Sequence, residues 1–92
     1  MSLELATSKY YNFIKLLIDN NISNNITDKL KNVNFLLFIR TFKNKYIELN
    51  KDKEKIKKYV IDEFKINITD FKNEFIDKIY RYLDFFIDLS NI

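Results

Sequence analysis

The chain contains neither glycine nor proline in its 92 residues. These two residue types make most tight turns, because glycine adopts positive φ angles without a steric penalty and proline fixes φ at a turn corner. Hairpins depend on such turns, whereas the interior of a helix excludes both residues. Since 47% of the residues are hydrophobic, the chain also has enough apolar surface for a core. The missing glycine and proline therefore predict an all-α fold.

Apolar residues recur at helical spacing over four segments of the chain. The spacing predicts helices over about residues 7–20, 28–49, 53–64 and 70–89. The second of these is apolar nearly all round its middle, as is typical of a helix that other helices contact from several sides. We therefore expect one helical domain over residues 1–92, a compact bundle of four to five helices around a long central helix.

The tetrapeptide NITD occurs at residues 25–28 and again at residues 67–70. Each copy matches the Asn-x-Thr acceptor of N-glycosylation, and each is also typical of a helix start. The first residues lack the basic start and apolar run of a signal peptide, so we expect a soluble, cytoplasmic protein. This favours capping, by Thr27 and Asp28 for the second helix and by Thr69 and Asp70 for the fourth. The stretch ATS, residues 6–8, is expected to cap the first.

The composition excludes several kinds of chemistry. Without cysteine and histidine, the chain cannot form disulfides, thiolate or imidazole metal sites, or nucleophile-histidine pairs. Without glycine it has no glycine-rich phosphate loop. The longest apolar run, FLLFI at residues 35–39, is too short to cross a bilayer. We therefore expect a protein that is not an enzyme and has no cofactor, no metal and no membrane partner.

Charge is unevenly distributed along the chain. Residues 40–58 hold eight basic and three acidic residues, whereas residues 70–92 hold three basic and five acidic ones. This basic middle could neutralise a phosphate backbone, or it could be a solvated linker, and charge alone does not separate the two interpretations.

The fourth predicted helix carries a polar stripe at steps of three and four residues. The stripe could hold a cation, dock a partner or simply face solvent, and its members are Asp70, Glu74, Asp77, Arg81, Asp84 and Asp88. We expect Arg81 to pair with Asp77 and Asp84 along the helix. The aromatic residues, 16% of the chain, fall mostly at core phases and are expected to pack inside.

Three collinear stretches carry a resemblance to a known family. They are LATSKYYNFIKLL at residues 5–17, LKNVNFLLFIRTFKNK at residues 30–45 and FIDKIYRYLDFFIDL at residues 75–89. The chain resembles, over nearly its whole length, the small all-helical subunit of type III-A CRISPR-Cas (Csm) effector complexes. Two family positions differ: an arginine is replaced by Tyr11, and a basic residue of the central helix falls at Leu37. Arg40, one turn later, is the candidate for that second role.

The resemblance implies a non-catalytic RNA-binding subunit. Several copies would stack head to tail along a guide RNA paired with its target RNA, beside other CRISPR effector subunits. A head-to-tail stack would suit the basic middle and the acidic end. Lys9 and Arg81 match family positions, whereas Lys43 and Lys45 are candidates because of charge. The expected RNA-binding residues are therefore Lys9, Arg40, Lys43, Lys45 and Arg81.

A second interpretation involves no nucleic acid. The stretch IKKYVIDEFK, residues 56–65, is similar to the last helices of the N-terminal domain of transcript-elongation factors, which bind peptides. This similarity implies a helical protein-protein interaction module.

Overall fold

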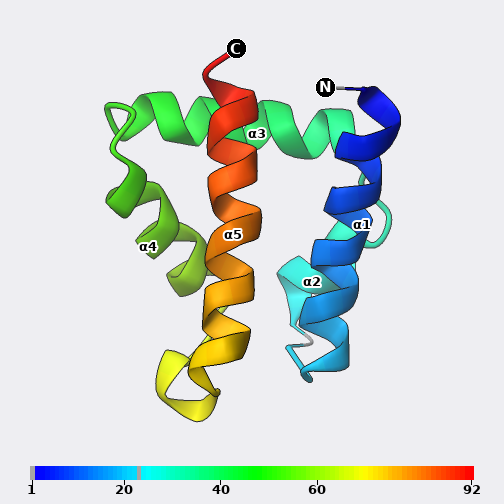
Figure 1. Ribbon diagram of the computed structural model, residues 1–92, viewed down its shortest axis with the longest axis vertical. Coiled ribbons are helices and arrows are strands. Elements are labelled where there is room, and N and C mark those ends of the chain that lie inside the picture. Colours follow the sequence, from blue (N-terminus) through cyan, green and yellow to red (C-terminus); the bar gives the residue numbers. More distant parts are fainter. Residues whose placement is uncertain (1, 23) are drawn as a thin grey trace.

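The computed structural model describes residues 2–22 and 24–92, and over these residues the fold is all-α with no strand. The elements are α1 (Leu3–Asp19), α2 (Asn25–Leu30), α3 (Phe35–Glu48), α4 (Lys53–Glu63), the 3₁₀ helix η1 (Ile68–Asp70) and α5 (Asn73–Ser90). In Figure 1, α3 lies across one end of the molecule, where both termini also lie, while α1, α5 and α4 extend away from it. The predicted bundle of four to five helices is confirmed.

Packing centres on α5, which contacts α1, α3 and α4. Its Phe86 is fully buried, and the ring centroid lies 5.4 Å from that of Phe13 in α1, 5.0 Å from Phe38 and 5.9 Å from Phe42 in α3. Buried apolar side chains from α1, α3, α4 and α5 form one cluster. The expectation that the aromatic residues pack in the core is confirmed for this group.

The long second helix expected over residues 28–49 is wrong, because the chain leaves the helix between α2 and α3. Asn34 caps the new helix, its Oδ1 accepting from the backbone N–H of Leu37 at 2.9 Å. Tyr10 on α1 also stabilises this break, because its hydroxyl donates to the carbonyls of Leu30 and Val33, both at 3.1 Å. A buried tyrosine therefore satisfies carbonyls that a continuous helix would have bonded internally.

Tyr10 has a perturbed acidity as a result of this position. Its side chain is fully buried, and this desolvation, with a smaller contribution from Tyr11, raises the pKa of Tyr10 from 10.0 to about 12. The hydroxyl thus stays protonated as a donor above pH 10, where an exposed tyrosine ionises.

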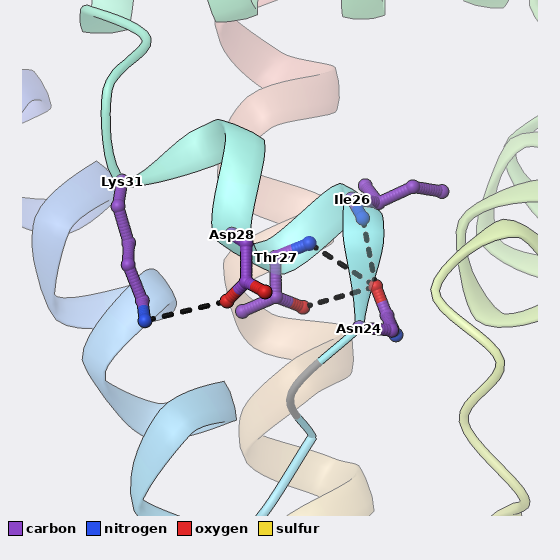
Figure 2. Close-up of polar contacts among 5 residues, drawn as sticks. All are labelled: Asn24, Ile26, Thr27, Asp28 and Lys31. Atoms are coloured by element: carbon purple, nitrogen blue, oxygen red, sulfur yellow. Dashed lines mark hydrogen bonds and ion pairs between the residues drawn. The ribbon is translucent and has the colours of Figure 1, made fainter.

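The first NITD copy lies inside α2, so the predicted capping by Thr27 and Asp28 is wrong. Asn24 is the cap: its Oδ1 accepts from the backbone N–H groups of Ile26 at 3.0 Å and Thr27 at 3.1 Å, and from Thr27 Oγ1 (Figure 2). The amide nitrogen of Asn24 also donates to the carbonyl of Phe64 after α4. Asp28 forms an exposed ion pair with Lys31 instead, at 3.4 Å.

The other predicted caps are also wrong. Helix α1 begins at Leu3 with Ser2 as its cap, which places residues 6–8 inside the helix. In the second NITD copy, Asn67 accepts from the N–H and hydroxyl of Thr69 and caps η1. Helix α5 starts three residues after Asp70, and its N-cap residue, Lys72, makes no side-chain capping bond.

Three helices end in left-handed residues although the chain has no glycine. Asn21 after α1, Asn50 after α3 and Lys65 after α4 have φ of 63°, 61° and 56°. In each case the residue after the left-handed one donates its backbone N–H to a carbonyl in the last turn of the helix. For example, the Ile66 N–H donates to the Ile61 carbonyl at 3.0 Å. This is the bonding of the Schellman motif, which usually has glycine at the left-handed position.

Candidate nucleic-acid interface

A cationic groove runs between α1 and α5. Steps of three and four residues bring one side of each helix to it: Lys9, Asn12, Leu16 and Asp19 on α1, and Lys78, Arg81, Tyr82 and Phe85 on α5. Lys15 completes the lining, and the open groove has a volume of about 530 Å³. Four cationic side chains and one carboxylate thus face the same space. We call this the α1/α5 groove.

Two of the expected RNA-binding residues meet in this groove although they lie near opposite ends of the chain. Lys9 is half-buried on α1, and its Nζ lies 5.1 Å from the centroid of the Phe85 ring on α5. Arg81 is exposed, one turn before Phe85. The packing of α1 against α5 therefore places the two side chains matched by the resemblance at one site.

The intrahelical pairing expected for Arg81 is wrong. Among the described residues, Arg81 takes part in none of the ion pairs within 4 Å, and Asp84 pairs instead with Lys57 of α4 at 2.7 Å. Nζ of Lys57 also lies 5.6 Å from the ring centroid of Tyr80. Asp84 therefore links α4 to α5, and Arg81 faces the groove.

The other three expected residues, Arg40, Lys43 and Lys45, lie on α3 and do not line the α1/α5 groove. Lys45 pairs with Glu48 at 3.3 Å and lies 4.5 Å from the Tyr59 ring centroid, so it packs α3 against α4. Lys43 and Lys45 are two residues apart and point about 200° apart around the helix. The three residues therefore do not form one surface.

Sequence reasoning missed the two other cations of the groove, Lys15 and Lys78, both of which are exposed. Each lies next to the apolar stripe of its helix, at the edge of the surface that contacts another helix. A helical projection of each segment could have shown this position. That α1 packs against α5, however, cannot be read from either segment alone.

A second, apolar groove lies among α2, α3 and α4, with a volume of about 350 Å³. Its floor is built mostly of aliphatic and aromatic side chains, and Lys29, Lys45 and Glu63 are its charged residues. Leu37 on its edge is 52% exposed. The α4 side is formed by Ile56, Tyr59, Val60, Glu63 and Phe64, all within the stretch similar to transcript-elongation factors.

Over residues 2–22 and 24–92, no three acidic side chains converge as ligands of a metal ion would. Nor does any helix in these ranges combine the length and the apolarity needed to span a bilayer. Comparison of the chain with protein-family models, with curated proteins and with solved structures finds no match.

Proposed function

We propose that this protein is a non-catalytic RNA-binding subunit that holds the phosphate backbone of RNA in the α1/α5 groove. The observation that carries the proposal is that Lys9 and Arg81 line one groove together with Lys15 and Lys78. Cations on a shared concave surface bind phosphates without reading bases, as a backbone-holding subunit requires.

The charge of the groove sets the kind of binding expected. Each phosphate neutralised by a lysine or arginine releases counterions, so affinity falls as salt rises. With four cations the slope of log K against log salt is about −3 for a single strand. Arg81 is available for a forked contact with a phosphate, because no carboxylate of the described residues lies within ion-pair distance of it.

The resemblance makes the proposal more specific. It implies a cytoplasmic, type III-A CRISPR (Csm) interference complex, in which several copies of this subunit stack along the guide RNA and target RNA beside other effector subunits. Charge supports the head-to-tail arrangement, since lysines concentrate around the α3–α4 connection and carboxylates along α5. One copy could thus present its basic region to the acidic helix of the next.

Two variants with equal change of charge test the groove. The first replaces Lys15, Lys78 and Arg81 by Gln, and the second replaces Arg40, Lys43 and Lys45 by Gln. Fluorescence anisotropy with a labelled RNA at low salt should show that the groove variant binds at least tenfold more weakly than the parent, a loss of about 1.4 kcal/mol of binding free energy. The α3 variant should stay within about twofold of the parent. Loss of binding in the α3 variant alone overturns the proposal.

The apolar groove supports a second candidate function, a peptide-binding interaction module of the transcript-elongation-factor type. Its α4 wall coincides with residues 56–65, which carry that similarity. An NMR titration separates the two candidates, because RNA should shift the amides of α1 and α5. A peptide that forms an amphipathic helix should instead shift those of α2, α3 and α4, and Leu37→Lys should abolish its binding.

A further inference from the structure

We infer that the RNA segment held in the α1/α5 groove is unpaired, and that one of its bases stacks on Phe85. This inference rests on the proposed binding of RNA in the groove, and it departs from the resemblance, which implies a guide RNA paired with its target. It depends on two features of the groove: its aromatic wall and the charges that border it.

The aromatic wall lies among the cations. Phe85 and Tyr82 are both half-buried, and both line the groove beside Lys78 and Arg81. The Tyr82 ring packs against the buried Phe13, with 5.6 Å between the centroids, and the Phe85 centroid lies 5.8 Å from that of its sequence neighbour Phe86. A fixed ring within a cationic groove is the combination found in single-strand binding sites, where bases stack and phosphates pair with cations.

The Phe85 ring already has a cationic partner. In the free protein that partner is Nζ of Lys9, 5.1 Å from the ring centroid. Such a contact at a partly exposed position is worth about 0.5–1 kcal/mol, so a stacking base can replace it. Lys9 would then be released to contact the neighbouring phosphate, as it also would be in a variant without the Phe85 ring.

The border of the groove disfavours a duplex. On α5 the rim is acidic, because Asp77 and Asp84 stand next to Lys78 and Phe85, about 100° around the helix. Although Asp84 is paired with Lys57, the exposed Asp77 and Asp88 remain to repel the second strand.

The test compares a short labelled oligouridine with a duplex of the same length, using the full chain. Phe85→Leu keeps apolar bulk but removes the stacking face, and it should weaken oligouridine binding about fivefold to tenfold without changing the salt slope. The matched control is Tyr80→Leu, a half-buried ring on the same helix with Lys57 over it but outside the groove. It should leave oligouridine affinity unchanged.

A crosslinking experiment on the unmodified chain avoids any loss of folding. Oligouridine carrying 5-iodouracil should crosslink to Phe85 or Tyr82 on irradiation, and mass spectrometry locates the adduct. Binding of the duplex as tightly as the single strand overturns the inference while leaving phosphate binding in place. Crosslinks confined to helices other than α1 and α5 overturn both the inference and the assignment of the groove. Absence of binding to both RNAs overturns the proposed function itself.

Discussion

At the scale of single residues, asparagine takes roles that other chains give to glycine, serine or aspartate. Asn24, Asn34 and Asn67 cap helices, and Asn21 and Asn50 adopt left-handed backbone at helix ends. An asparagine side chain suits both roles, because it bonds to nearby backbone amides and tolerates positive φ. The sequence pattern located the starts of α1, α2, α4 and α5 within four residues and missed that of α3. It named the wrong capping residues, since several asparagine, threonine and aspartate neighbours compete for each position.

Asn24 should contribute more to stability than a cap usually does. Asn24→Ala removes the bonds to Ile26 and Thr27 and also the bond to the carbonyl of Phe64, which joins α2 to the end of α4. We expect the free energy of unfolding to fall by about 2 kcal/mol in urea denaturation, at the upper end of the range for caps. Asn67→Ala, at the exposed cap of the three-residue η1, should lower the free energy of unfolding by less than half of that amount. Equal losses of stability in the two variants would contradict this account.

Tyr10 should make stability depend on pH in the alkaline range. Its pKa is about 12 in the folded state and 10.0 unfolded, so the folded state retains the proton more strongly. Its contribution is therefore complete below pH 10 and is lost as pH rises toward 12. Tyr10→Phe lacks the two hydroxyl bonds, and it should be less stable than the parent at pH 7 by about 1–3 kcal/mol. Urea unfolding should show this difference shrinking between pH 10 and 12; a constant difference would argue against the shifted pKa.

At the scale of elements, the sequence predicted helices well and their interruptions poorly. The third segment, residues 53–64, agrees with α4 to within one residue, because Asp52 provides a clear cap and the apolar period is regular. The break between α2 and α3 was missed because no glycine or proline marks it. It depends on Tyr10, which is distant in sequence and reaches the carbonyls of Leu30 and Val33.

The end of α4 offers a test at this scale. Lys65 has φ of 56°, which costs a non-glycine residue about 1 kcal/mol or more. Lys65→Gly should therefore raise the free energy of unfolding by about 0.5–1 kcal/mol, measured by urea denaturation. The control is Lys58→Gly, at an exposed position within the same helix, which should lower the free energy of unfolding by about 1 kcal/mol. A destabilised Lys65→Gly variant would show that the lysine side chain matters more than the backbone.

At the scale of the whole molecule, the structure separates charges that the sequence grouped together. The basic middle is not one surface: Lys45 lies over the Tyr59 ring of α4 and Lys57 pairs with Asp84 of α5, while the lysines of the α1/α5 groove come from outside that stretch. The groove could be predicted only in part. The resemblance pointed to Lys9 and Arg81, but their proximity to Lys15 and Lys78 requires knowing that α1 packs on α5.

The proposed head-to-tail stacking predicts association driven by charge. Sedimentation velocity should show oligomers at low salt and high protein concentration that dissociate as salt screens the contact. Replacing Asp77 and Asp88 by Lys should prevent association, and mixing this variant with one carrying Lys53→Glu and Lys55→Glu should restore it. A protein that stays monomeric at every salt and protein concentration would rule this arrangement out.

Binding of RNA by the α1/α5 groove is the central claim, and the salt dependence of RNA affinity tests it most directly. For the parent chain, log K against log salt should have a slope of about −3 with single-stranded RNA. Replacing Lys15, Lys78 and Arg81 by Gln should flatten the slope by about 2, since each lost phosphate contact removes about 0.7. The variant with Gln at Arg40, Lys43 and Lys45 should keep the parent slope. If the α3 variant flattens the slope and the groove variant does not, the phosphate site lies on α3 and the account is wrong.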